Sequence, residues 1–282
     1  AQRVEENSDG RIEIEIFHSA QLFGGKEELG AVERGDIDMS APLDIYHTGA
    51  VPSLGVSSLP FMWPSPASLQ ATLDAGLWDQ GIAQDLRDKN MVVLNVAVGG
   101  PYQIYAKDFE VRTPEDLAGK KIAVSGTTAS KALELMDGSP TTMSSGELYL
   151  ALQRGTIDGT TRPLLTGLGR NLYEVVDHLT LTNMAYFTSF LVINQDSWDA
   201  LPADLQAVVQ DAADQRSVEQ LPLLEDFLDA AVARFEERGV NVHEATAEEL
   251  AAFQERMAPV YDWWTGQVDD ADTLIAFARE NQ

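Results

Sequence analysis

The chain has 282 residues, 44% of them hydrophobic, so it is long enough for two domains or one large α/β domain with a buried core. It contains no cysteine, which excludes disulfides, thiolate nucleophiles and thiolate metal ligands. A formal net charge of −26 repels phosphate backbones and excludes nucleic acid as a partner.

The first hundred residues are predicted to alternate between helices and strands. Alternating polar and apolar residues predict a half-buried strand over 11–17. The mostly apolar run 91–98 is typical of a strand in a parallel sheet. The remaining patterns predict helices over 1–7, 26–34 and 69–86, and a short buried strand over 38–45.

The middle of the chain continues this alternation. Thr113 is predicted to cap a helix that begins at Pro114 and carries acidic residues in its first turn. Further strands are predicted over 121–124 and 187–194, and further helices over 128–136 and 146–155. Strands that alternate with helices favour an α/β fold with mixed, mostly parallel sheets.

The last third of the chain is predicted to be helical. Apolar residues recur at helical spacing over 203–238, a length that spans two lobes. Pro222 lies inside this segment and is expected to kink or interrupt the helix. Thr246 and Glu249 form a capping box for a following helix.

A search for catalytic chemistry finds no candidate. The phosphate-binding, dinucleotide-binding and nucleophile-elbow motifs are absent. The four histidines are far apart and none has metal-ligand spacing. We therefore predict no catalytic residue, no metal site and no cofactor, and keep an enzyme only as an alternative class.

A series of motifs then follows in order along nearly the whole chain. The most specific runs from Pro140-Thr141-x-Met143 through Glu147-x-Tyr149-x-Ala151 to Ile157-Asp158-Gly159. Others are Gln21-Leu22-Phe23-Gly24, Gly35-x-Ile37-Asp38-Met39, Leu59-Pro60-Phe61, Thr113-Pro114-Glu115-Asp116-Leu117, Leu179-Thr180-Leu181-Thr182-Asn183 and Leu201-Pro202-Ala203-Asp204-Leu205. Together they resemble the solute-binding proteins of bacterial TRAP transporters, which are of the DctP type.

This resemblance implies a periplasmic-binding-protein-like fold with two α/β lobes, a ligand cleft between them and a long kinked helix across both. Residues 1–98 and 187–226 are expected to form the first lobe, and 99–186 and 227–282 the second. The family's opening strand would precede Ala1, and any export signal is expected to have been removed. The resemblance further implies a periplasmic monomer that passes a small solute to the TRAP permease subunits; a binding protein that feeds a sensor is the alternative.

Three positions depart from the family pattern. The family's arginine that clamps a ligand carboxylate falls at Ala123, and a second arginine is replaced by Tyr102. Arg162 stands where a ligand-contacting asparagine is expected. The resemblance therefore leaves two interpretations of the ligand.

In the leading interpretation the ligand is an organic acid held by Arg162, because guanidinium groups bind carboxylates in a bidentate manner. In the alternative it is a small amine, amino alcohol or zwitterion whose ammonium binds Asp44. In that alternative the aromatic rings of Tyr46, Phe61, Trp63, Tyr102 and Phe187 are expected to surround the cation. Asn183 is a further candidate ligand contact.

Overall fold

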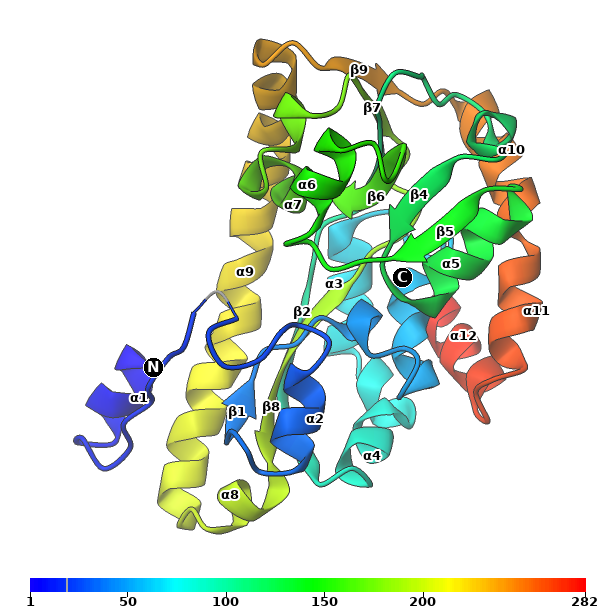
Figure 1. The fold of residues 1–282 in the computed structure, drawn as a ribbon. Coiled ribbons are helices and arrows are strands. Elements are labelled where there is room, and N and C mark those ends of the chain that lie inside the picture. The colour runs from blue at the N-terminus through cyan, green and yellow to red at the C-terminus, as the bar shows by residue number, and fades with distance from the viewer. Residues whose placement is uncertain (19) are drawn as a thin grey trace.

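The computed structural model describes residues 1–18 and 20–282, which form two lobes (Figure 1). The sheet of the first lobe has the order β1-β8-β2, formed by β1 (Met39–Ser40), β8 (Thr188–Asn194) and β2 (Met91–Val98). Both strand pairs in it are antiparallel. The predicted strands 91–98 and 187–194 are thus confirmed, although 91–98 does not pair in parallel.

The helices of the first lobe are short. The predicted helix 69–86 is divided into three shorter helices. Gly76 (φ 98°) and Gly81 (φ 131°) lie between them, in non-helical backbone conformations that interrupt the helix. The lobe contains α1 (Gln2–Asn7), α2 (Glu28–Glu33), η1 (Asp44–Tyr46), η2 (Pro52–Ser58), α3 (Pro66–Asp74), η3 (Leu77–Gln80), α4 (Ile82–Arg87) and α8 (Gln195–Asp199).

Two predicted strands of this lobe are corrected by the structure. The strand predicted over 11–17 is absent, because no strand among the described residues pairs with this segment, and alternating polarity alone does not form a ladder of hydrogen bonds. The strand predicted over 38–45 is limited to Met39–Ser40. It ends there because Pro42 has no N–H for a ladder and Asp44 begins a 3-10 turn.

The second lobe is built on a larger sheet of order β5-β4-β6-β3-β7-β9. β4 pairs in parallel with β5 and β6, and β7 with β9, whereas β3 is antiparallel to both β6 and β7. This sheet is therefore mixed, as predicted, but with the antiparallel sheet of the first lobe parallel pairs do not predominate. The strands are β3 (Tyr102–Ala106), β4 (Lys121–Val124), β5 (Ser139–Thr142), β6 (Gly159–Pro163), β7 (His178–Leu181) and β9 (Asn241–Glu244).

Local capping chemistry sets two helix starts in this lobe. Thr113 and Asp116 form a capping box at η4 (Pro114–Leu117), and Thr246 and Glu249 form another at α10 (Ala247–Met257), as predicted. The remaining helices are α5 (Gly126–Leu135), α6 (Leu148–Gln153), α7 (Leu164–Gly169), η5 (Leu172–Glu174), α11 (Pro259–Thr265) and α12 (Ala271–Glu280).

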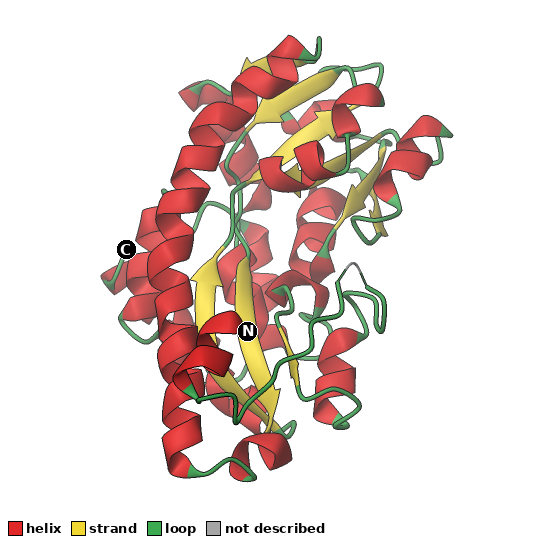
Figure 2. Cartoon of the chain, turned by 90° about the vertical axis from the view of Figure 1, so that its left-hand side faces the viewer, coloured by secondary structure: helices red, strands yellow, loops and turns green. Residues whose placement is uncertain are grey.

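Helix α9 (Ala203–Glu237) runs the length of the molecule (Figures 1 and 2). It packs on β2 in the first lobe and on α7 and β9 in the second, so the predicted helix across both lobes is confirmed. It continues through Pro222 without interruption. No helix in residues 1–18 and 20–282 is both long and apolar enough to span a membrane.

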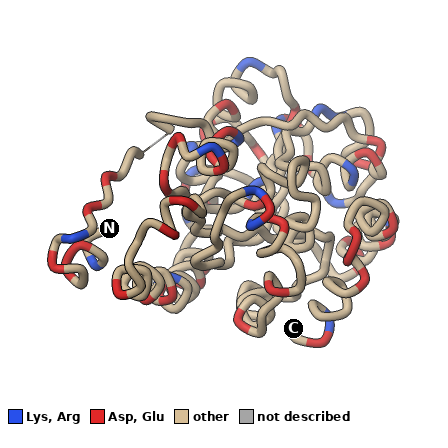
Figure 3. The backbone as a smooth tube through the Cα atoms, turned by 90° about the horizontal axis from the view of Figure 1, so that it is seen from below, with Lys and Arg blue, Asp and Glu red and all other residues tan. Residues whose placement is uncertain are grey.

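Two extended segments also cross between the lobes, side by side. Residues 99–101 join β2 to β3, and residues 182–187 join β7 to β8. The N–H of Gly99 donates to the Phe187 carbonyl at 2.7 Å, and the N–H of Tyr102 to the Ala185 carbonyl at 2.8 Å. These bonds align the two crossings. Acidic positions are spread over the backbone as seen from below (Figure 3), in keeping with their even spread in the sequence.

Candidate functional site

Arg162 is a buried cation at the end of β6, with a side chain that is only 1% exposed. Its Nη1 donates to the carbonyls of Thr161 (2.6 Å) and Ala123 (3.4 Å), and its Nη2 to those of Met143 (2.7 Å) and Val124 (3.4 Å). Its Nε has no hydrogen-bond partner. Among the described residues no carboxylate lies within 4.0 Å of the guanidinium.

The electrostatics of this arrangement are unfavourable for the protein alone. Burial lowers the pKa of Arg162, because the charged guanidinium loses its solvation. Carbonyl dipoles compensate only in part, and a buried charge without a counter-charge is costly. A site of this kind favours an anion that approaches Arg162 and completes its pairing.

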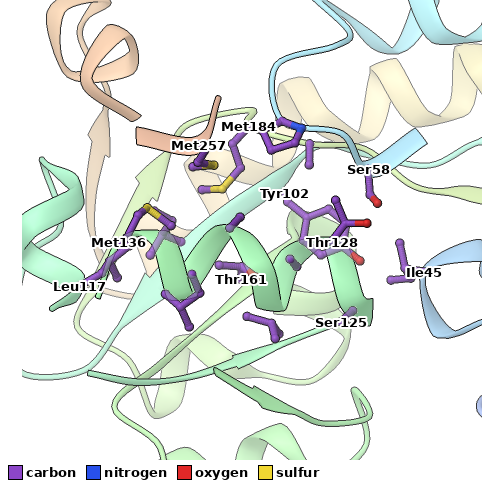
Figure 4. Close-up of a pocket in the computed structure, with 17 residues that line it drawn as sticks. Ile45, Ser58, Tyr102, Leu117, Ser125, Thr128, Met136, Thr161, Met184 and Met257 are labelled. Carbon is purple, nitrogen blue, oxygen red and sulfur yellow. The ribbon is translucent and has the colours of Figure 1, made fainter. Parts of the chain in front are cut away.

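A separate cavity of about 40 Å³ lies at the junction of the lobes, on the face of the second sheet opposite to the Arg162 side chain (Figure 4). Thr161 and Val124 line it with their side chains, while their carbonyls accept the hydrogen bonds from Arg162. Its walls combine Ile45, Ser58 and Pro60 of the first lobe with Met184 and Ala185 of a crossing segment and Tyr102 at the start of β3. Its remaining walls come from α5, Leu117 and Met257.

Three hydroxyl groups at this cavity have no hydrogen-bond partner. They belong to Ser125, Thr128 and Thr161, which are 3%, 1% and 8% exposed. Buried hydroxyls are normally paired, and leaving one unpaired costs free energy. Unpaired hydroxyls that line a cavity are groups on which a ligand can form hydrogen bonds.

Some of the predicted aromatic contacts gather at this place. Tyr102 lines the cavity, and Phe187 packs edge-on against it with ring centroids 6.1 Å apart. Burial raises the pKa of the Tyr102 phenol, and the positive charge of Arg162 opposes this rise. Tyr46 is half-buried, and its hydroxyl hydrogen-bonds the Ser145 hydroxyl at 2.9 Å.

Other predicted contacts lie elsewhere. Trp63 is 2% exposed and its Nε1 donates to the Ser57 carbonyl at 3.0 Å, as expected of a core residue. Phe61 is half-buried in a left-handed conformation (φ 55°). Asn183 is exposed, and its Oδ1 accepts from Gln103 at 2.6 Å. None of these three side chains lines the cavity.

Asp44 is wholly buried and surrounded by protein donors. Its Oδ1 accepts from the N–H of Ile45 at 2.6 Å, and its Oδ2 from the N–H (2.8 Å) and hydroxyl (2.6 Å) of Thr188 and from the Ser57 hydroxyl. These bonds join η1 and η2 to β8. Burial nonetheless raises the pKa of Asp44 to about 6, since it outweighs the donors that favour the charged form.

Asp44→Asn is expected to change how stability depends on pH. The folded-state pKa of Asp44, about 6, lies above its ordinary value of 3.8, so its contribution to stability is largest below pH 4 and is lost as pH rises through 6. The free energy of unfolding of the variant, relative to wild type, should therefore rise by about 2 kcal/mol between pH 4 and pH 7. Urea unfolding at both pH values measures this, with Asp226→Asn on exposed α9 as the control for the loss of one negative charge. A constant difference between Asp44→Asn and wild type across this range would contradict it.

The two lobes also contact each other directly, away from the crossing segments. Thr127 donates from its N–H and its hydroxyl to the Thr48 hydroxyl, both at 3.1 Å, and Lys26 donates to the Thr142 carbonyl at 3.3 Å. Gly126, with φ 77°, sits where any Cβ would be 2.4 Å from the carbonyl oxygen of Ile45. The close approach of the lobes over the cavity thus depends on a glycine at this position.

Sequence reasoning missed most of the cavity. Ser125, Thr128 and Thr161 lie in or beside matched motifs, but nothing in their local pattern indicates that their hydroxyls lack partners. The methionines Met136, Met184 and Met257 come from separate parts of the chain and have no shared signal. Within the described part of the chain, no group of His, Asp and Glu is arranged to hold a metal ion.

Two lobes joined by three crossings, with a buried arginine that has no carboxylate partner among the described residues, define a two-lobed solute-binding protein. The model of the bacterial extracellular solute-binding proteins, family 7 (DctP), matches residues 1–267. The chain belongs to this family, whose members serve TRAP transporters, and it is a binding protein and not an enzyme.

The similarity to relatives extends over nearly the whole of this chain. A solute-binding protein of Chromohalobacter salexigens is 28% identical over 284 residues, 100% of this chain and 83% of the relative. The C4-dicarboxylate-binding periplasmic protein DctP of Rhodobacter capsulatus is 27% identical over 97% of this chain and 82% of its own length. A Chromohalobacter salexigens TRAP periplasmic solute-binding protein, solved with D-glucuronate, superposes with a TM-score of 0.94 at 27% identity, covering 100% of this chain and 93% of that one. One from Sulfurospirillum deleyianum, solved with succinate, gives 0.92 at 25%, covering 100% and 92%.

Proposed function

We propose that the protein captures a small organic acid anion on Arg162 and delivers it to the membrane permease of a TRAP transporter. The observation that carries this proposal is the burial of Arg162 without a carboxylate partner. An incoming carboxylate provides the missing counter-charge and hydrogen-bonds the guanidinium. The acids bound by the relatives, glucuronate and succinate, support the same class of ligand.

The amine alternative has less support. Asp44 would have to bind the ammonium, but four donors of the protein already surround its carboxylate. Its raised pKa further weakens it as a permanent negative charge. Asp44 is better explained as the group that joins η1 and η2 to β8.

The lobe boundaries form part of the proposal. Residues 1–98 and 187–226 carry the β1-β8-β2 sheet, and residues 99–186 and 227–282 carry the larger sheet, α9 passing between them. One refinement concerns α12, which packs on η2 and η3 of the first lobe. We further propose that the protein acts as a monomer in the periplasm, where its relatives are found.

A ligand screen tests the proposed class directly. Thermal unfolding is measured with panels of small organic acids and small amines, each at several concentrations. An acid at about 100 times its dissociation constant should add ~2.7 kcal/mol to the free energy of unfolding, because it binds only the folded state. Stabilisation by amines alone would overturn the anion proposal and leave the binding role intact.

A further inference from the structure

We infer that the cavity between α5 and the sheet of the second lobe is a second binding site, which takes a small uncharged alcohol and is independent of Arg162. This inference goes beyond the proposed function and needs no anion on the guanidinium. Four features of the cavity carry it: its separation from Arg162, its uncharged walls, the uneven distribution of its polar groups, and its size.

The cavity and the Arg162 side chain lie on opposite faces of the sheet. Side chains alternate between the two faces along a strand, so Thr161 and Arg162, which are neighbours in β6, point to opposite sides. The pairing of β3 with β6 agrees with this. Ile104, which is opposite Thr161, lines the cavity, whereas Gln103, which is opposite Arg162, does not. A molecule in the cavity therefore does not compete with an acid for the guanidinium.

The walls of the cavity are uncharged. Of the 17 described residues that line it, none is Asp, Glu, Lys, Arg or His. A charged solute would lose its hydration there without gaining a counter-charge, which is costly. The molecule that fits this cavity is therefore uncharged.

Polar and apolar groups lie toward different sides of the cavity. Figure 4 shows three thioether side chains toward one side, those of Met136, Met184 and Met257. Ser125 and Thr128 lie toward the other side. Their hydroxyls, like that of Thr161, are buried and have no hydrogen-bond partner within the described part of the chain. An alcohol suits both sides, because its hydroxyl can donate and accept while its alkyl chain contacts the thioethers.

The size of the cavity limits the length of this alcohol. One water-sized group needs ~10–15 Å³ of such a cavity, so about 40 Å³ holds roughly three separate groups. Bonded atoms lie closer together than water molecules do, so a chain of roughly four or five non-hydrogen atoms is accommodated. Propan-1-ol and butan-1-ol are molecules of this size.

The test is ¹⁹F NMR of the full chain with 3,3,3-trifluoropropan-1-ol as the probe, displaced by ethanol, propan-1-ol, butan-1-ol and hexan-1-ol. Affinity should rise about four-fold with each carbon from ethanol to butan-1-ol, as for burial of one methylene, and should not rise further to hexan-1-ol. Butanoate should not displace the probe. A rise that continues to hexan-1-ol would indicate an open surface and overturn the inference.

A filled cavity provides the matched variant. Ala132 on α5 lines the cavity, and Ala132→Leu places an isobutyl group in it. This change should weaken binding of the probe about ten-fold or more, because the space is taken. Glu134→Leu introduces the same side chain at an exposed position of the same helix and should leave binding unchanged. Wild-type binding by folded Ala132→Leu would place the probe elsewhere.

A second variant keeps the test decisive if Ala132→Leu does not fold. Butan-1-ol and diethyl ether are isomers, and only the alcohol has a hydroxyl donor, so wild type should prefer the alcohol about three-fold or more. Thr128→Val removes one unpaired hydroxyl with little change of shape and should lower this preference. Equal binding of the two isomers by wild type, or an unchanged preference in Thr128→Val, would overturn the placement of the hydroxyl.

The cavity also links this site to the lobes, because Ile45 of the first lobe and α5 of the second both line it. An alcohol in it therefore favours the closed form. Gly126→Ala, whose Cβ would meet the Ile45 carbonyl oxygen at 2.4 Å, should weaken binding of the probe. Gly119→Ala, whose Cβ meets nothing within 4 Å, should not. Equal binding by these two variants would place the probe outside the junction of the lobes.

The inference and the proposed function fail separately. If no alcohol displaces the probe, or the probe itself does not bind, the cavity is not an alcohol site and the inference is wrong. Capture of an acid on Arg162 is measured without any alcohol present, so it is unaffected by that result. Conversely, loss of acid binding in Arg162→Met should leave the binding of the probe unchanged.

Discussion

Arg162→Met is expected to raise the dissociation constant of a bound acid on the order of 100-fold. Methionine retains much of the length of the side chain but removes its charge and all of its donors. A hydrogen bond to a charged group is worth about 1.5–3 kcal/mol, and 1.4 kcal/mol corresponds to ten-fold in affinity. Isothermal titration of the wild type and the variant with the best acid of the screen measures the loss.

Two further variants help to interpret the result for Arg162→Met. Arg154→Met removes an exposed arginine at the end of α6 and should bind the acid as wild type does. Arg162→Lys keeps the charge without the planar pair of donors, so its affinity should lie between those of the wild type and the methionine variant. Wild-type affinity in folded Arg162→Met would mean that the anion is bound elsewhere.

Gly126→Ala is expected to hold the lobes apart and to weaken acid binding by about ten-fold or more. The new Cβ would meet the Ile45 carbonyl at 2.4 Å and the Thr48 hydroxyl at 3.0 Å, so the two lobes must separate locally. The closed form then becomes a minor population, and the apparent affinity falls with that population. Small-angle X-ray scattering should show a larger radius of gyration in the presence of the acid than for wild type.

Gly119→Ala is the matched control for this substitution. Gly119 has a similar backbone conformation (φ 70°), but a Cβ there meets nothing within 4 Å. Both variants therefore have the cost of a left-handed alanine, roughly 1–2 kcal/mol, and only Gly126→Ala adds the clash between the lobes. Equal binding by the two variants would exclude a role for Gly126 in closure.

Local chemistry made parts of the fold predictable. The N-cap at Thr113 and the capping box at Thr246 were predictable because each depends on residues within one helical turn; that Thr113 also forms a box with Asp116 is added by the structure. The strand predicted over 11–17 is wrong because a strand also needs a neighbour, which no pattern within seven residues contains. The predicted predominance of parallel strand pairs was wrong for the same reason, since strand direction depends on where the chain returns to the sheet.

The candidate site was predictable only in part. Arg162 stood out because it departs from a motif, and the structure adds its burial and its lack of a carboxylate partner. Asp44 was proposed as a ligand contact, but its partners Ser57 and Thr188 lie 13 and 144 residues further along the chain. Whether a carboxylate is free to bind a ligand or is already hydrogen-bonded within the protein depends on such distant donors, and sequence spacing does not reveal them.

The acidic surface has a consequence for the rate at which an anion arrives. An anion drawn to Arg162 must first approach a molecule of net charge −26, whose acidic residues are spread along the chain (Figure 3). At low ionic strength this field slows the encounter, the reverse of electrostatic steering. Salt at 0.15 M shortens the reach of the field to about 8 Å, while the contact with Arg162 inside the protein is screened far less. Salt therefore quickens the arrival of an anion and leaves its retention almost unchanged, so the proposed capture of an acid would work best in saline surroundings.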